Sequence, residues 1–245
     1  MLAVLVLIGA VVAAPPMDAV TLISVEQEIA VGREANAEMR RRTREVADTA
    51  TLRYVRQVGA RLARVAPGPH YPYSFTVADT TEVNAFSLPG GPVWVNRGVL
   101  MTAGTEAEFV SVVAHEVAHV ALRHAAGQAT TAALARWSLT VLGAMLGNAG
   151  GAGAAQVAGA LMANGAVLTF SREDEREADR VGATIMRQAG WSPTGMVDMF
   201  ARLSRADDQQ PAGTLTFFST HPAPRERLEA LRGQVGQRPR GTRDS

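Results

Sequence analysis

The sequence contains no cysteine in its 245 residues. Disulfide bonds, thiol nucleophiles and cysteine-based metal sites are therefore excluded, and any bound metal must be held by histidines and carboxylates. Lysine is also absent, and we attach no function to the exclusive use of arginine for its 24 basic residues. The 23 acidic residues nearly balance this charge. A nucleic-acid partner is not expected, because such proteins concentrate positive charge on one face.

Long apolar runs are also few, and each is shorter than the roughly 20 residues that span a bilayer. Residues 2–14 form an unbroken apolar run. No basic residue precedes it, but we interpret residues 1–14 as a signal peptide, with a buried first helix or an uncleaved anchor as alternatives. Because no cysteine follows, a lipoprotein anchor is not expected. The predicted location is the periplasm or the bacterial envelope, with membrane anchoring as the alternative.

Charged residues are missing from residues 137–170, which are rich in glycine. We predict a hairpin of two short apolar helices packed on the rest of the domain. Contact with a membrane surface, or a cover over the active site, are the alternatives. The hydrophobic content of 47% supports one sizeable core, and we assign residues 15–235 to a single domain. Residues 236–245 are predicted to be a polar tail.

The rest of the sequence predicts a helix-rich α+β fold with a small sheet. Capping boxes begin predicted helices at Ser24 and at Thr105, ending near residues 43 and 122, and another helix follows Asp48. Residues 71–77 and 93–96 are predicted strands, and the extended segment between them ends in a Pro-Gly-Gly turn. Helices resume at residues 171 and 192 and after residue 222.

The strongest chemical signal is an HExxH motif that runs from His115 through Glu116 to His119. On a helix, residues four apart project about 40° apart and one turn along, so both imidazoles can reach one metal ion. Glu116 lies beside them, where it can take a proton from a metal-activated water. The surrounding segment is apolar nearly all round and predicts a buried helix. The motif therefore predicts one catalytic Zn²⁺ with Glu116 as general base.

A catalytic zinc ion needs a third protein ligand and an open position. His124 lies about 180° around a continuing helix from His115, so it would reach the ion only if the helix ended first. On the helix predicted from residue 171, Glu175 and Asp179 share the otherwise apolar face, whereas Glu177 points the other way. We therefore predict Glu175 as the third ligand. Asp179, one turn later, is predicted to orient a ligating histidine.

Four segments resemble the zinc metallopeptidases of the CaaX prenyl protease and HtpX family: HEVAHVALRH, SREDEREAD, NAFSLPGG with its VNRG continuation, and STHPAPRER. The resemblance extends over about residues 24–231 and is greatest to the exported, periplasmic BepA-like branch. HExxH alone marks many zinc enzymes, whereas HExxH with a downstream ExxAD is more specific to this glutamate-zincin group. The resemblance implies a zincin-like (gluzincin) fold with zinc on His115, His119 and Glu175, and Glu116 as the base.

The resemblance also implies functions for residues outside the two motif helices. The extended segment with Asn84, Ala85 and Phe86 would border the active-site cleft and hold a substrate backbone by strand addition. His221, in the Thr-His-Pro motif, is a candidate fourth ligand on a plug-like loop, and a surface histidine at a helix start is the alternative. Arg227 is a candidate for stabilising an oxyanion, with a salt bridge as the alternative.

The sequence therefore predicts a zinc-dependent metalloendopeptidase that hydrolyses internal peptide bonds of misfolded or membrane-associated envelope proteins. Polypeptides are the expected substrates, and a membrane surface is a candidate contact. One alternative is a zinc-containing envelope chaperone or binding module whose site His221 holds closed. Another is an integral membrane protease anchored by the apolar hairpin.

Overall fold

The computed structural model describes residues 23–128, 170–208, 216–222 and 224–235. Its elements are, in chain order, α1 (Val25–Arg42), α2 (Thr49–Ala63), β1 (Ser74–Ala78), β2 (Ala85–Ser87), β3 (Pro92–Asn96), α3 (Arg97–Thr102), α4 (Glu106–Ala121), α8 (Arg172–Gln188), α9 (Thr194–Asp208), α10 (Thr216–Thr220) and α11 (Pro224–Val235). The predicted helix-rich α+β architecture with a small sheet is confirmed. The predictions for residues 1–14, 137–169 and 236–245 fall outside the described residues.

The first two helices begin at the predicted capping residues. The Ser24 hydroxyl accepts a hydrogen bond from the Gln27 N–H, and the Gln27 side chain accepts one from the Ser24 N–H, which completes the capping box of α1. The Asp48 carboxylate accepts from the first backbone amides of α2. Both caps satisfy amides that would otherwise lack a partner at a helix start.

The predicted capping box of α4 forms only in part. The Thr105 hydroxyl accepts from the Glu108 N–H at 3.2 Å, as expected. The Glu108 carboxylate, however, accepts from the Gly104 N–H at 2.9 Å and from Arg202 of α9 at 2.7 Å. Glu108 therefore does not accept from the Thr105 N–H, as a complete capping box requires. Its bond to Arg202 instead connects α9 to the start of α4.

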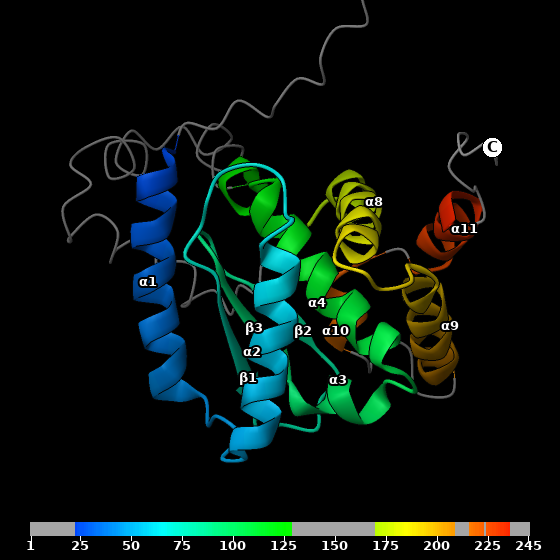
Figure 1. Ribbon diagram of the computed structural model, residues 1–245, viewed down its shortest axis with the longest axis horizontal. Helices are drawn as coiled ribbons and strands as arrows, with labels where there is room; N and C mark the ends of the chain where they lie inside the picture. The colour runs from blue at the N-terminus through cyan, green and yellow to red at the C-terminus, as the bar shows by residue number, and fades with distance from the viewer. Residues whose placement is uncertain (1–22, 129–169, 209–215, 223, 236–245) are drawn as a thin grey trace, which may run out of the picture.

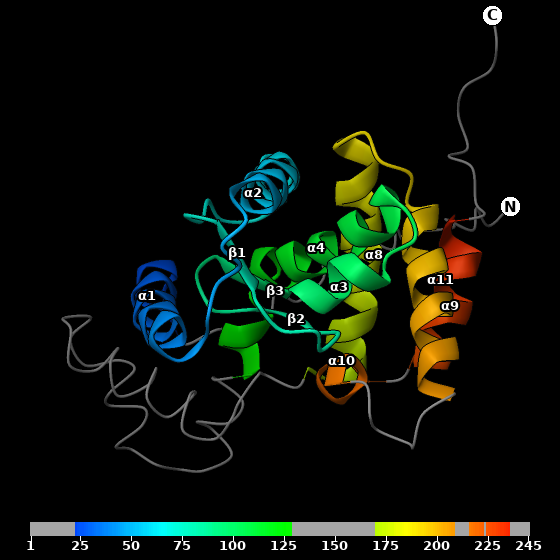
Figure 2. The same ribbon diagram turned by 90° about the horizontal axis from the view of Figure 1, so that it is seen from below.

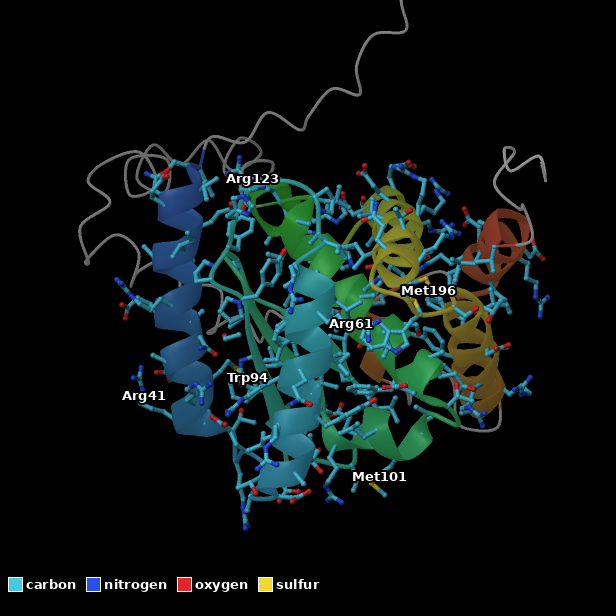
Figure 3. All side chains as sticks on the ribbon, viewed as in Figure 1. Arg41, Arg61, Trp94, Met101, Arg123 and Met196 are labelled. Atoms are coloured by element: carbon cyan, nitrogen blue, oxygen red, sulfur yellow. The ribbon has the colours of Figure 1, made fainter. Side chains whose placement is uncertain are left out.

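The sheet has the strand order β1-β3-β2, with β1 parallel and β2 antiparallel to the central β3. All five residues of β3 are buried. Trp94 faces α1, where its indole N–H donates to Asn36 at 2.9 Å, whereas Val93 and Val95 belong to the main core (Figure 3 labels Trp94). The β2–β3 turn needs Gly90, whose φ is 72° and whose added Cβ would lie 2.5 Å from the backbone of α1.

Helix α4 is the centre of the fold, as its apolar sequence predicts. Every residue from Glu108 to Ala121 is buried. The sheet and α2 pack on one side of α4, and α8 and α9 pack on the other (Figures 1 and 2). Gly182 allows the close approach of α8, because a Cβ there would lie 3.1 Å from Met196 and 3.3 Å from the Ala114 carbonyl oxygen. The two helices that carry the predicted site are therefore in direct contact.

A buried polar group joins α1 to the end of α4. Arg123 follows α4 with φ at 61° and donates to the Glu28 carboxylate at 3.0 Å and to the Ile23 carbonyl oxygen at 2.5 Å (Figure 3). The Tyr71 hydroxyl also donates to Glu28. Burial raises the pKa of Glu28, although Tyr71 and Arg123 oppose that shift.

Three local features differ from the sequence prediction. The first strand begins at Ser74 rather than at residue 71, because Pro72 has no N–H and the Tyr73 N–H donates to the Tyr71 carbonyl oxygen in a turn. The short helices α3 and α10 were not predicted, since six and five residues give little periodic signal.

In the described part of the chain, no helix combines the length and the apolar character needed to cross a membrane.

Candidate metal centre

Helix α4 presents the HExxH side chains from inside the core. The Nε2 atoms of His115 and His119 lie 3.0 Å apart. Both imidazoles and the neighbouring Glu116 carboxylate are buried. The two rings meet edge to face, with 4.6 Å between their centroids. The convergence of the rings that the motif predicts is confirmed.

Helix α8 brings Glu175 to the same point. Its carboxylate oxygens lie 3.3 Å from Nε2 of His115 and 3.4 Å from Nε2 of His119. The helix begins at the predicted capping box, in which the Ser171 hydroxyl accepts from the Asp174 N–H at 3.1 Å. Glu175 therefore lies in the first turn of α8 and faces α4, as the apolar face of this helix predicts.

His221 supplies the fourth donor of the cluster, and its third nitrogen, from the chain that follows α10. Its Nδ1 lies 2.9 Å from Glu175 Oε1 and 3.3 Å from His115 Nε2. Its Nε2 lies 3.2 Å from Glu116 Oε1. The ring stacks on Phe217 at 4.7 Å, and the side chain is only 1% exposed. His221 is therefore part of the buried cluster and does not lie on the surface.

The donor atoms fit a small divalent cation. One donor atom from each of His115, His119, Glu175 and His221 can be chosen so that all four lie within 4.8 Å of one another. Two ligands on a tetrahedral zinc ion, with bonds of about 2.0–2.1 Å, are about 3.4 Å apart. The contacts to Glu175, at 2.9–3.4 Å, are close to that separation. Imidazoles and a carboxylate are also the ligands that zinc takes in proteins without cysteine.

Asp179 and Arg227 form a second layer behind His115 and Glu175. Asp179 Oδ1 lies 3.0 Å from His115 Nδ1. Arg227 Nε and Nη2 donate to the two Asp179 oxygens at 2.7 Å each, and Arg227 Nη1 forms an ion pair with Glu175. The salt bridge expected as one interpretation of Arg227 is present. The oxyanion function of this residue stays a prediction.

His119 has an outer partner that the sequence did not suggest. His124 Nδ1 lies 2.8 Å from His119 Nδ1, and His124 Nε2 lies 3.5 Å from Glu177 Oε2. The Phe170 ring stacks on His119 at 3.8 Å. The helix ends at Ala121, close to the predicted end near residue 122, and Arg123 makes that end with φ at 61° and without a glycine, so the continuing helix assumed for His124 is not present. His124 therefore contacts Nδ1 of His119, the ring nitrogen that does not face the cluster.

The pKa values of the cluster follow from burial and from neighbouring charges. Burial raises the pKa of Glu116, but His221 together with His119 and His115 outweighs that effect and lowers it to about 2. Burial lowers the pKa of His221, but Glu175 and Glu116 outweigh it and raise that pKa to about 10. Burial and His115 together lower the pKa of His119 to about 3. These effects keep His119 neutral, as a ligand must be, and Glu116 ionised, whereas His221 would have to lose its proton to bind a metal ion.

Strand β2 lies beside the cluster at one edge of the sheet. His221 Nε2 lies 3.4 Å from the carbonyl oxygen of Ala85, the first residue of β2. Asn84 is buried, and its side-chain oxygen accepts from the Thr220 hydroxyl at 3.4 Å. Phe86 is partly buried and stacks on Trp94 at 6.3 Å. The predicted edge segment is therefore a strand, and its contact with substrate stays a prediction.

Two histidines one turn apart on a buried helix, with a carboxylate from a second helix, are the ligand arrangement typical of metal-dependent hydrolases. Residues 49–235 match Peptidase family M48, and the chain belongs to this family. The family resemblance inferred from the motifs is confirmed.

Similarity to curated proteins extends over most of the chain. It is 30% identical over 224 residues to the "Beta-barrel assembly-enhancing protease" of Yersinia pestis, covering 88% of this chain and 45% of that protein. It is 32% identical over 181 residues to the "Mitochondrial metalloendopeptidase OMA1" of Schizosaccharomyces pombe, covering 74% and 52%. It is 30% identical over 164 residues to the "Metalloprotease LoiP" of Escherichia coli, covering 67% and 63%. The chain thus spans less than two thirds of each relative.

Proposed function

We propose that this chain is a zinc-dependent metalloendopeptidase of the gluzincin type. His115, His119 and Glu175 would hold one zinc ion, and Glu116 would act as general base. The observation that carries the proposal is the approach of the Glu175 carboxylate to both motif imidazoles within 3.4 Å. Membership of Peptidase family M48 supports it.

A bound zinc ion would polarise the scissile carbonyl and acidify a water molecule. Glu116 takes the proton of that water and later delivers it to the leaving amine. Its two oxygens are buried, and Oε1 lies 3.2 Å from His221 Nε2. The carboxylate can therefore accept the proton that the reaction releases once His221 has withdrawn from it.

His221 regulates this base in the proposed mechanism. Its charge lowers the pKa of Glu116 to about 2, which makes the carboxylate a poor proton acceptor. Withdrawal of His221 removes that charge and frees the position next to Glu175. The same movement therefore strengthens the base and provides the open position that a catalytic zinc site needs.

The edge strand β2 is the proposed binding place for the substrate backbone. An extended peptide could pair with this strand, whose Ala85 carbonyl oxygen lies 3.4 Å from His221 Nε2. Backbone pairing depends little on the side chains of the peptide, so selection by sequence would be loose. Asn84 and Phe86, on either side of Ala85, would then contact the ends of the bound segment.

The proposed substrates are misfolded or membrane-associated proteins of the bacterial envelope. The apolar run at residues 2–14 supports export to that compartment. The name of the Yersinia pestis relative, a protease that enhances β-barrel assembly, also supports this assignment. Residues 15–235 would form the mature catalytic domain.

The test of the reaction is the variant Glu116→Gln. It keeps the three proposed ligands, so bound zinc, measured by atomic absorption, should equal that of the wild type. Casein cleavage should fall by at least about 100-fold, the loss that removal of a general base produces. Cleavage at the wild-type rate would show that the assigned mechanism is wrong.

The buried position of His221 also favours a second function, that of an envelope binding module with a closed site. The variant His221→Ala separates the two functions. A self-inhibited peptidase should cleave casein faster without this imidazole. A pure binding module should cleave casein neither as the wild type nor as the variant.

A further inference from the structure

A groove of about 810 Å³ lies on the side of the sheet remote from β2. Figure 2 shows β1, the other edge strand, between α1 and α2. Residues from both helices and from the chain that enters β1 line the groove. The lining residues that matter for its chemistry are Arg40, Arg56, Arg64, His70, Tyr73 and Phe75.

The lining of this groove is basic. It includes three arginines and no carboxylate. Arg40 is paired with Glu45 and donates to the Thr76 hydroxyl at 3.0 Å. Arg56 and Arg64 are exposed, and neither meets an acidic side chain in the part of the chain that the structure describes. Two positive charges, on α2 and on its C-cap residue, therefore face the groove without a counter-charge among the described residues.

The groove also follows a sheet edge that is only half covered. Residues 44–46 pair with the far end of β1, where the Val46 N–H donates to the Val77 carbonyl oxygen at 3.0 Å. At the near end, the Ser74 N–H points toward β3 and donates to the carbonyl oxygen of Gly91, just before that strand, at 3.4 Å. Because strand residues alternate, the backbone N–H and C=O of Phe75 point outward like those of Val77. No backbone group among the described residues pairs with them on that side.

We propose that this groove binds an extended, acidic polypeptide segment that adds a strand to β1 at Phe75. An unpaired strand edge accepts such a segment through its backbone groups. Arg56 on α2 and Arg64, the helical C-cap residue of α2, are eight residues apart, which corresponds to about 12 Å along the helix axis. Carboxylates four residues apart on an extended chain are separated by about 13 Å. The groove therefore selects acidic residues at positions i and i+4.

The form of the groove favours a peptide over an anionic lipid surface. A flat array of headgroups can neutralise exposed arginines, but it cannot form strand-like hydrogen bonds with the Phe75 backbone at the base of the groove. The groove is also separate from the metal cluster, because β3 lies between β1 and β2. Binding here leaves the β2 edge accessible, so the partner need not be the segment that is cleaved.

Fluorescence anisotropy on the full-length Glu116→Gln chain tests the proposal without cleavage of the probe. The probe is a labelled nonapeptide of Val and Thr with Glu at the third and seventh positions. Its controls carry Gln at both positions, or N-methyl groups on alternate amides. The double variant Arg56→Glu/Arg64→Glu removes the basic pair, and Arg187→Glu on the exposed face of α8 is the matched control.

The acidic peptide should bind at least about tenfold more weakly to the double variant, and with wild-type affinity to Arg187→Glu. The Gln and N-methyl peptides should also lose about tenfold or more. Hydrogen exchange of the Phe75 amide should slow in the complex. The proposal is overturned if the Gln peptide binds equally, if the Phe75 amide is unaffected, or if only phosphatidylglycerol vesicles bind. Each result is independent of casein cleavage and so of the proposed peptidase function.

Discussion

The carboxylate of Asp179 lies 3.0 Å from Nδ1 of His115, on the side of the ring opposite to Glu175. A carboxylate in this position holds the proton of a neutral imidazole on Nδ1 and leaves the lone pair of Nε2 for a metal ion. Burial raises the pKa of Asp179, but Arg227 together with His115 outweighs it and lowers the pKa, so the carboxylate stays ionised.

Replacing Asp179 by asparagine should weaken metal binding without removing a ligand. The amide cannot hold His115 in one orientation as the carboxylate does, so zinc affinity should fall about 10- to 100-fold. Competition with a chromophoric chelator measures this change. Asp198→Asn on the exposed side of α9 is the control and should bind zinc normally. Equal affinities in the two variants would contradict the orienting function of Asp179.

Replacing Arg227 by methionine should reduce the free energy of unfolding by about 3–5 kcal/mol. The guanidinium is 1% exposed and pairs with both Asp179 and Glu175, and its loss would leave two buried carboxylates without their shared arginine. Urea denaturation with and without zinc measures the loss, and zinc should restore part of it. Arg180→Met removes an exposed pair with Glu177 and should change stability by only about 0–1 kcal/mol.

Replacing His124 should show whether this residue orients His119 or binds zinc itself. Loss of the 2.8 Å contact with His119 Nδ1 in His124→Ala should lower zinc affinity by about tenfold. His124→Asn can place an amide oxygen near the same nitrogen and should recover part of the affinity. Isothermal titration of zinc into the two variants checks this order. Complete loss of zinc from both variants would indicate that His124 is itself a ligand.

Acid should destabilise the chain in part through Glu108. The hydrogen bond from Arg202 lowers the pKa of this carboxylate below its unfolded value of about 4.3. The unfolded chain therefore binds the proton more readily. The stabilisation is complete above the unfolded pKa and is lost as pH falls through the folded pKa.

The variant Glu108→Gln should already lack this stabilisation at neutral pH, with an expected loss of about 1–3 kcal/mol. Its urea midpoint should then fall less than that of the wild type between about pH 6 and pH 3. Parallel pH dependence in the two proteins would show that the Arg202 contact contributes nothing to acid sensitivity.

The sequence predicted the site better than its surroundings, for a physical reason. Helical periodicity places His115 next to His119, and the apolar face of α8 selects Glu175 over Glu177, so local geometry alone identifies these three. The contact between His119 and His124 depends on where α4 ends, and Arg123 makes that end without a glycine. The loss of half the Thr105 capping box likewise depends on Arg202, which lies 94 positions from Glu108.

The buried cluster depends on helix α11, which lies near the C-terminal end of the chain. Arg227 is the group on that helix that neutralises Asp179 and Glu175, and its Nη1 also donates to the His221 carbonyl oxygen at 3.4 Å. Truncation of the chain before α11 would remove the guanidinium while α4 and α8 kept their ligand side chains. The charge balance of the cluster on α4 and α8 therefore rests on a residue close to the C-terminal end of the described chain.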